Sequence, residues 1–365
     1  MDEKILLDQA KALEGEIVSN RRTVHGYAEL GFDIPQTFRF VMERLTEYGC
    51  SPYPVGKAGI CCDLGQENGP TILLRADMDA LPMEERSRLP FASTNGNAHT
   101  CGHDVHTAML LGAAKLLKSR EKELQGRVRL MFQPAEELLA GAVDMIEAGV
   151  LTGVDAAIGL HIAVGTDYSR TGMLLCPEGV GCNSGDAYTI LIQGKSAHGS
   201  TPEKGVDAIL IAARIIEAFQ TLVSREVEMD EPCVLLVGTI EGGTSSNSVA
   251  ESAKLGVSLR TGNAAVRERM KRRIVEVAQG VAATYRGSVE VRHEFGSPPL
   301  ENDKAMREFA RETLRNAFGE EWVGVQPKVG GEDFAHVSIG CPRCFWAWAA
   351  AVRQRVIPIF PTSRS

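Results

Sequence analysis

Up to about residue 182, the chain alternates between two patterns of apolar positions. Amphipathic runs with helical spacing are separated by short apolar runs of strand length. The helical runs are 6–22, 36–48, 105–118 and 137–147, and the apolar runs are 71–74, 128–132 and 156–160. Short apolar strands between helices are typical of a largely parallel sheet with helices on its faces. We therefore predict a layered α/β domain.

From about Asn183 the pattern follows a different order. It predicts strand, helix, strand, strand, helix and strand at 186–193, 205–224, 233–241, 252–261, 264–285 and 288–295. This order is that of the split βαβ, or ferredoxin-like, α+β arrangement. The glycine-rich run 179–185 and the PPLEN stretch at 298–302 bracket it, and another helix follows at 304–318. We predict a discontinuous domain made of 1–182 and 299–365, with an inserted domain at 183–298.

Composition narrows the classes of protein that the chain can be. An apolar fraction of 44% and a charged fraction of 24% are ordinary for a globular protein. No run approaches the roughly 20 apolar residues that a membrane span needs, and the acidic start does not resemble a secretory signal. A net charge of −8 disfavours nucleic acid as a partner. We expect a cytoplasmic protein that binds neither membranes nor nucleic acid.

The nine cysteines are irregularly spaced, and in a chain without an export signal we expect reduced thiols. Cys341 and Cys344 form a CxxC without a second such pair. One open hypothesis is therefore a redox protein with a structural metal site. It requires these two thiols to lie near Cys101.

The segment AHTCGHDVHTA at 98–108 brings together His99, Cys101, His103 and His106. Thiolate and imidazole are the side chains that hold transition metals. The alternative is a polar loop whose histidines cap a helix. The density of the cluster favours metal binding.

Acids and a further histidine follow the predicted strands at the points where these end. Asp77 and Asp79 follow the first strand, Glu136 and Glu137 the second, and His161 follows the third directly. In open α/β sheets, ligands bind in the crevice beyond the carboxyl ends of the strands. Each residue alone is more simply read as a turn acid or a satisfied histidine. Together with the cysteine–histidine cluster, they predict a metal site.

Neighbouring carboxylates after a strand point in divergent directions, so one can bind metal while the other faces a substrate. A metal-bound water has a lowered pKa and attacks a carbonyl carbon when a carboxylate takes its proton. We assign Glu136 as the general base and Glu137 as a metal ligand. Asp77 and Asp79 suit the task of holding a ligand histidine by its other ring nitrogen, unless one of them ligates instead.

Three residues of the inserted domain are candidates for substrate contacts. His198, in the turn-like segment SAHGSTP, is a candidate donor to the oxyanion that develops during amide hydrolysis, although a lone histidine there is usually structural. Asn247 lies in a glycine-rich loop. Arg260 ends a strand, from where its guanidinium can make a two-pronged contact with a carboxylate.

Seven segments, in their order, resemble the aminoacylase and hippurate hydrolase family, which includes the indole-acetyl-amino-acid hydrolases and belongs to a clan of di-metal carboxypeptidases. They are RRTVHGYAELGF (21–32), RADMDALP (75–82), HTCGHDVHTAMLLGAA (99–114), FQPAEE (132–137), GLH (159–161), SAHGSTP (196–202) and GGEDFA (330–335). The resemblance implies a catalytic α/β domain with up to two divalent metals, Zn²⁺ or Mn²⁺, and an inserted lid often used for dimerisation. Implied substrates are N-acyl or N-aroyl amino acids, or small peptides.

The resemblance also implies roles for single residues of the catalytic domain. Cys101 would bridge the two metals, and His103, Glu137 and His161 would be further ligands. Glu136 would be the base, and we place Asp79 with the catalytic residues.

In the lid, the resemblance implies that His198 stabilises the tetrahedral intermediate, supplied by the other subunit of a dimer. Asn247 and Arg260 fall where lid residues contact the substrate, and we place Gly331 of GGEDFA with them.

The end of the chain departs from the family pattern. Family members carry a last metal-ligating histidine near the C-terminus, whereas no histidine follows His336 here, and His336 comes too soon after GGEDFA to be the obvious substitute. We therefore expect the second metal to be bound loosely or not at all, and the last strand and helix of the catalytic domain to be missing. The leading hypothesis is a metal-dependent amidohydrolase. The alternative is an impaired relative that binds acyl-amino acids or peptides without turnover.

Overall fold

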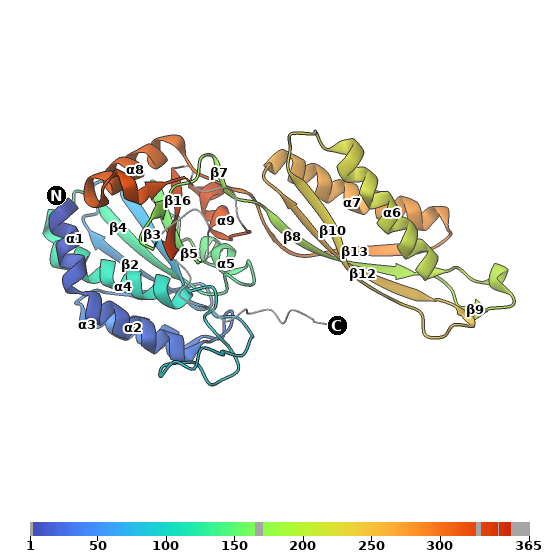
Figure 1. The fold of residues 1–365 in the computed structure, drawn as a ribbon, viewed down its shortest axis with the longest axis horizontal. Helices are drawn as coiled ribbons and strands as arrows, with labels where there is room; N and C mark the ends of the chain where they lie inside the picture. The colour runs from blue at the N-terminus through green and yellow to red at the C-terminus, as the bar shows by residue number, and fades with distance from the viewer. Residues whose placement is uncertain (1–2, 165–170, 326–329, 342, 352–365) are drawn as a thin grey trace. The chain divides into compact units, whose positions relative to one another are not determined.

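The computed structural model describes residues 3–164, 171–325, 330–341 and 343–351, and the chain divides into two compact units (Figure 1). Unit 1 consists of Met1–Gly181, Glu301–Pro327 and Val337–Ser365. Unit 2 consists of Cys182–Leu300 and Lys328–His336. The last of these segments groups with unit 2, although the sequence pattern assigns it to the discontinuous domain. The short strands β7 (Val180–Cys182) and β14 (Leu300–Glu301) lie where the chain passes from one unit to the other.

Unit 1 is built on an eight-stranded sheet in the order β1-β2-β4-β3-β5-β16-β6-β15. Its strands are β1 (Tyr53–Val55), β2 (Gly59–Gly65), β3 (Thr71–Asp77), β4 (Arg127–Gln133), β5 (Ala156–Val164), β6 (Leu174–Leu175), β15 (Val323–Gly324) and β16 (Cys344–Ala351). The central strand β3 pairs in parallel with β4 and β5, and β5 pairs in parallel with β16. The parallel centre confirms the predicted fold class.

The helices of unit 1 complete its layers. They are α1 (Glu3–Ala12), α2 (Glu14–Tyr27), α3 (Pro35–Glu47), α4 (His103–Ser119), α5 (Gly141–Glu147) and α8 (Lys304–Phe318), with α9 (Phe334–Gly340) at the boundary and short 3-10 turns at Glu121–Glu123 and Glu320–Trp322. α4 packs on β3, β4 and β5, and α2 and α3 lie side by side next to it (Figure 1). Apolar residues of these helices, such as Val41 and Leu111, form one core with Ile60, Leu130 and Phe132 of the sheet.

Two helices differ from the sequence-based prediction, because the backbone turns at positions where the sequence pattern does not predict a turn. The helix predicted at 6–22 is two helices, α1 and α2, since the chain makes a tight turn at Leu13, whose amide donates to the carbonyl of Ala10. The helix predicted at 137–147 begins only at Gly141. Ala135 and Leu139 have φ angles of 53° and 50°, which a right-handed helix does not allow.

Two strands also differ. β5 continues to Val164, so His161 lies inside this strand instead of following it. β16 forms over Cys344–Ala351 and pairs with β5 along its length. The expectation that the last strand is missing is therefore wrong. The helix expected to be missing would fall in 352–365, outside the described residues.

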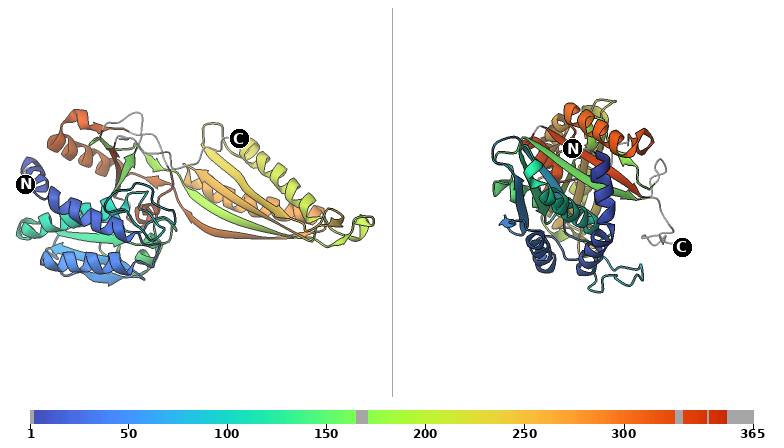
Figure 2. Two further views of the ribbon diagram at one scale, coloured as in Figure 1. Left: turned by 60° about the horizontal axis from the view of Figure 1, so that its bottom comes forward. Right: turned by 90° about the vertical axis from the view of Figure 1, so that its left-hand side faces the viewer.

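Unit 2 has the predicted split βαβ order. Its elements are β8 (Gly185–Gln193), β9 (Ala197–His198), a 3-10 turn (Pro202–Lys204), α6 (Ala208–Glu226), β10 (Cys233–Gly242), β11 (Ser248–Val249), β12 (Ser252–Thr261), α7 (Ala264–Thr284) and β13 (Ser288–Ser297). The four long strands form an antiparallel sheet in the order β10-β12-β8-β13. α6 and α7 cover one face of it (Figure 2), and their apolar side chains, such as Phe219 and Ile274, bury against Leu255 and Ile190.

None of the described helices combines the length and the apolar character that crossing a bilayer requires.

A buried ion pair joins α7 to the unit 2 sheet. The Asp186 carboxylate accepts hydrogen bonds from Arg267 Nε and Nη2 at 2.8 and 2.7 Å and lies 2.8 Å from His293 Nε2. Asp186 is 2% exposed, so its charge depends on these partners.

We predict that Arg267→Met lowers the free energy of unfolding of unit 2 by about 3–5 kcal/mol, because it leaves a buried carboxylate without its counter-charge. Urea unfolding of the full chain, followed by circular dichroism, measures this change. The matched control is Arg292→Met, which breaks an exposed ion pair with Glu290 on the same sheet and should leave the transition unchanged. Equal effects of the two substitutions would contradict the prediction.

Candidate metal centre

Six residues that the sequence singles out converge at the carboxyl ends of the parallel strands of unit 1. They are Asp79 after β3, Cys101 and His103 at the start of α4, Glu136 and Glu137 after β4, and His161 near the end of β5. The parallel register places these strand ends side by side, as Asp77↔Gln133 and Arg75↔Gly159 show.

A close approach of two backbone segments brings Cys101 to His161. Gly102, between Cys101 and His103, has a φ angle of 89°, which residues with side chains rarely adopt. A Cβ atom at this position would lie 2.2 Å from Ile162 Cδ1. Glycine therefore lets this loop pack against β5, and Cys101 Sγ lies 3.4 Å from His161 Nε2.

Backbone carbonyls fix the ring orientation of both ligand histidines. His103 Nδ1 lies 2.8 Å from the carbonyl oxygen of Asp79, and His161 Nδ1 lies 2.6 Å from that of Ile162. Because a carbonyl oxygen only accepts, each Nδ1 carries a proton and donates it. In the neutral form, each Nε2 then presents its lone pair, which is how a metal-binding histidine is oriented.

Asp79 positions the two glutamates. Its carboxylate oxygens accept hydrogen bonds from the amides of Glu136 and Glu137 at 2.9 and 3.2 Å. Glu136 Oε2 and Glu137 Oε1 consequently lie 3.9 and 3.8 Å from His103 Nε2. Asp79 also holds His103 as expected, since its carbonyl oxygen lies 2.8 Å and its Oδ1 3.6 Å from His103 Nδ1.

The donor set fits a divalent metal. Cys101 Sγ, His103 Nε2 and one Glu137 carboxylate oxygen lie within 4.8 Å of one another. His103 Nε2 and Glu137 Oε1 are buried and have no hydrogen-bond partner among the described residues. Unpaired buried donors and acceptors are costly, and a metal ion would satisfy both. Sulfur, imidazole nitrogen and carboxylate oxygen together are typical of zinc sites.

His106 belongs to the predicted cluster but is not available as a ligand. Its Nδ1 lies 2.5 Å from Asp77 Oδ1, and its Nε2 accepts a hydrogen bond of 2.9 Å from the amide of Ile162. Both ring nitrogens are thus engaged, although Asp77, His103, His106 and His161 offer metal-ligating atoms within 4.8 Å of one another. His99 belongs to no such cluster of the described residues.

Arg75, a charged residue inside β3, takes part in the same arrangement. Its Nε donates to Gln133 Oε1 at 2.9 Å and its Nη1 to Asp77 Oδ2 at 2.7 Å. Arg75 and Asp77 are 4% and 0% exposed, so this ion pair is buried below the metal centre. The sequence contains a signal for this ion pair, because Arg75 is a charged residue inside an apolar strand. Such residues are seldom buried unless they are paired.

Burial and charge shape the pKa values of the ligands. Burial raises the pKa of the Cys101 thiol to about 11 and lowers that of His161 well below its usual value. Burial also acts to lower the pKa of His103, but the Asp77 and Asp79 carboxylates and the Cys101 side chain together outweigh it, and the net pKa is raised. The site therefore favours a positive charge at His103, which a metal cation would supply in place of a proton.

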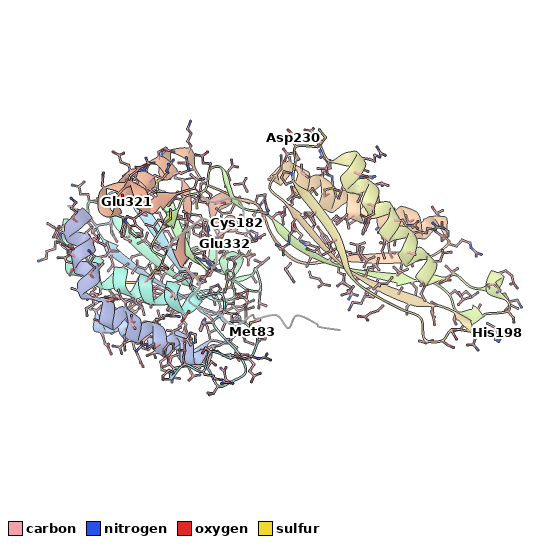
Figure 3. The ribbon with its side chains drawn as sticks, viewed as in Figure 1. Met83, Cys182, His198, Asp230, Glu321 and Glu332 are labelled. Atoms are coloured by element: carbon pink, nitrogen blue, oxygen red, sulfur yellow. The ribbon has the colours of Figure 1, made fainter. Side chains whose placement is uncertain are left out.

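The predicted residues of unit 2 form two separate groups. His198 and Asn247 are exposed neighbours at one end, where β9 pairs with β11. Figure 3 shows His198 at that end and Asp230 at the opposite end of the unit. Arg260 pairs with Val234, toward the Asp230 end.

The distance along one strand explains this separation. Arg260 lies eight residues along β12 from Ser252, which is at the His198 end, and this separation corresponds to about 26 Å. Arg260 Nη1 lies 4.0 Å from the position that a Cβ atom of Gly185 would take, and Gly331 also lies beside Gly185. His198 and Arg260 of one chain therefore do not meet at one small substrate.

Two alternative roles for residues near the C-terminus are not supported: His336 as a substitute metal ligand, and the CxxC thiols as part of a redox site. His336 Nε2 lies 3.2 Å from the Gly296 carbonyl oxygen, which makes this nitrogen a donor and not a ligand. Cys341 and Cys344 are buried thiols that belong to none of the metal-ligating clusters of the described residues. The redox hypothesis requires them beside Cys101 and is not supported.

Comparison with known families gives a match for residues 73–354, to the model of peptidase family M20/M25/M40. The chain belongs to this family. As a member of it, the protein is a metal-dependent hydrolase of carbon–nitrogen bonds.

The relatives of this M20-family protein cover most of its length. N-acetyl-L-cysteine deacetylase of Bacillus subtilis (strain 168) is 40% identical over 340 residues, which are 91% of this chain and 80% of the relative. An IAA-amino acid hydrolase of Arabidopsis thaliana is 38% identical over 346 residues, 90% and 76% of the two chains. A solved Bacillus subtilis structure, described as a dinuclear metal-binding peptidase of the M20 family, matches with a TM-score of 0.77 and 34% identity over 93% and 89% of the two chains.

We predict that metal binding releases protons. Because the pKa of the buried Cys101 thiol is about 11, a metal must displace its proton, and the affinity for Zn²⁺ should rise with pH. Titration calorimetry in buffers of different ionisation enthalpy counts the protons released. Cys101→Ser should release fewer protons, whereas Cys233→Ser, a thiol of unit 2, should match the unaltered protein. An unchanged proton count in Cys101→Ser would contradict the assignment.

Proposed function

We propose that this M20-family protein hydrolyses the amide bond of N-acyl or N-aroyl amino acids, or of small peptides, with a metal ion held by Cys101, His103, Glu137 and His161. The observation that carries the proposal is the convergence of these side chains, with the histidine rings oriented by carbonyl oxygens. The substrate class is supported by relatives named for N-acetyl-L-cysteine, IAA-amino acids and N-acyl-L-amino acids.

A bound divalent metal would polarise the scissile carbonyl and lower the pKa of the attacking water. Glu136 is the residue that accepts the proton of this water and delivers it to the leaving nitrogen. Its carboxylate is beside His103, and the hydrogen bond of its amide to Asp79 keeps the glutamate turn in place. Glu137, the next residue, is left to bind the metal.

We predict that Glu136→Gln lowers kcat by about 10²–10⁴-fold, because glutamine keeps the shape of the side chain but cannot take the proton. Hydrolysis of N-acetyl and N-benzoyl amino acids measures kcat, and metal analysis checks that the ion is retained. Glu84→Gln, an exposed glutamate of the same unit, is the control and should not change kcat. Retention of most activity by Glu136→Gln would show that another group is the base.

We further propose that His198 donates a hydrogen bond to the oxyanion in the site of a second copy of the chain. The Ser200 amide donates to His198 Nδ1 at 3.2 Å, so the neutral ring carries its proton on Nε2. This imidazole is exposed and therefore presents an N–H donor to another molecule. Asn247 lies beside it and would reach the same site.

A homodimer formed through unit 2 would supply the second copy. β10 is an edge strand of the sheet, and it exposes Val234, Leu236 and Ile240 by 57, 56 and 55%. An unpaired edge with exposed apolar side chains is a surface that proteins pair or cover. We propose that Arg260 and Gly331 also contact the substrate.

Mixing two inactive variants tests this arrangement. Glu136→Gln and His198→Ala homodimers should each be impaired. After exchange of subunits, half of the dimers are mixed and one of their two sites is intact, so we expect about a quarter of the wild-type activity. If each site used the His198 of its own chain, mixed dimers would contain no intact site and activity would not recover.

We propose that only one metal is bound tightly, because the four candidate ligands Cys101, His103, Glu137 and His161 suffice to coordinate one ion. Metal analysis after dialysis should give about one ion per chain, held by the four ligands named above. Two tightly held ions per chain would overturn this proposal.

The second candidate function is that of an impaired relative, because these four ligands serve one metal whereas the family resemblance implies two. Assays with added Zn²⁺, Mn²⁺ or Co²⁺ separate the two functions, since binding of N-acyl amino acids without turnover under all three conditions would favour it. We also propose a cytoplasmic location, which the nine free thiols support.

A further inference from the structure

His106 lies at the centre of the site without contributing a ligand atom. It is on α4, one turn after His103, and is 1% exposed. Its ring contacts those of His161 and His103, with centroids 4.5 and 5.5 Å away. A histidine that packs against two candidate ligand histidines would ordinarily be counted as a third ligand. The hydrogen bonds that its two ring nitrogens make therefore decide its role.

The proton of His106 is located by its partners. The amide of Ile162 can only donate, so His106 Nε2 must be the acceptor and carry no proton. In the neutral ring the proton is then on Nδ1, and it is donated to Asp77 Oδ1.

Ile162 connects this histidine to the metal ligand. The same residue that donates its amide to His106 accepts a hydrogen bond from His161 Nδ1 through its carbonyl oxygen. Orientation of the His161 ring therefore depends on a residue whose own position is fixed by His106. The Ile162 side chain is restrained as well, since it fills the space that a Cβ atom at Gly102 would need.

We propose that His106 is a positioning residue that acts on the metal through Ile162 and His161. The proposal rests on the metal centre of the proposed function. Asp77 and Arg75 form the buried base of this arrangement, because Arg75 holds the second carboxylate oxygen of Asp77. Side chains that support a ligand in this way typically change metal affinity by about 10–100-fold.

Replacing His106 by each of the two amide residues tests its two hydrogen bonds separately. In His106→Gln, the amide oxygen can occupy the place of Nε2 and accept from Ile162. In His106→Asn, the shorter amide can replace Nδ1 toward Asp77 but does not reach Ile162. If His106 were a metal ligand, the longer amide would not restore what the shorter one loses, because a carboxamide is a poor replacement for an imidazole ligand.

Cobalt binding provides a readout that does not depend on activity. Wild-type protein titrated with Co²⁺ should show thiolate-to-cobalt charge transfer and visible d–d bands. We expect His106→Asn to weaken Co²⁺ binding about 10–100-fold and to shift the d–d bands, and His106→Gln to restore both. His293→Gln, a histidine of unit 2, is the control and should bind Co²⁺ as the wild type does. Equal losses in His106→Gln and His106→Asn, or no loss in either, would overturn the proposal.

The tautomer of His106 tests the proposal in the unaltered, metal-free protein. Nitrogen-15 NMR of labelled histidines should find His106 neutral, with its proton on Nδ1 and a hydrogen-bonded Nε2. A proton on Nε2 would contradict the proposal, even if both variants failed to fold. If the wild-type protein showed no thiolate–cobalt band, the proposed metal centre itself would be contradicted. The tautomer measured by NMR would then be the only test of the role of His106.

Discussion

The metal centre depends on hydrogen bonds between histidine rings and the main chain beside the ligands. The carbonyl oxygens of Asp79 and Ile162 each accept an Nδ1 proton, so Nε2 of His103 and His161 is the atom that would face the proposed metal. Free imidazole side chains would lose rotational freedom when they bind a metal. Because these rings are already oriented, much of that entropic cost is met during folding.

Electrostatics gives the site its preference for a cation. Cys101, Glu137 and Asp77 gather acidic groups in a buried region, and Arg75 offsets only part of this charge. Without a metal, burial raises the pKa values of the Cys101 thiol and the Glu137 carboxyl, so it acts against the charged form of each. A divalent ion reverses this balance, since it stabilises the deprotonated ligands directly. Folding thus assembles acidic side chains whose negative charge a bound metal ion would balance.

The sequence predicts the layers, and it predicts which residues gather at the carboxyl ends of the strands, because both leave local signals. Apolar strands are followed by ligand residues, and parallel strands end at one edge, so Glu137 and His161 converge. The roles of His106 and His99 have no such signal, since a ligand and a supporting histidine are the same residue type. The turn before α5 could not be predicted either. Its positive φ angles fall on Ala135 and Leu139, whereas a glycine at such a position would have indicated a turn. The separation of His198 from Arg260 depends on strand register, which spacing along the chain does not reveal.

X-ray absorption spectroscopy of the zinc-loaded protein tests most directly whether Cys101, His103, Glu137 and His161 share one ion. The account predicts one sulfur neighbour at about 2.3 Å and nitrogen or oxygen neighbours at about 2.0–2.2 Å, with the sulfur lost in Cys101→Ser. A zinc shell of nitrogen and oxygen alone in the unaltered protein would contradict it.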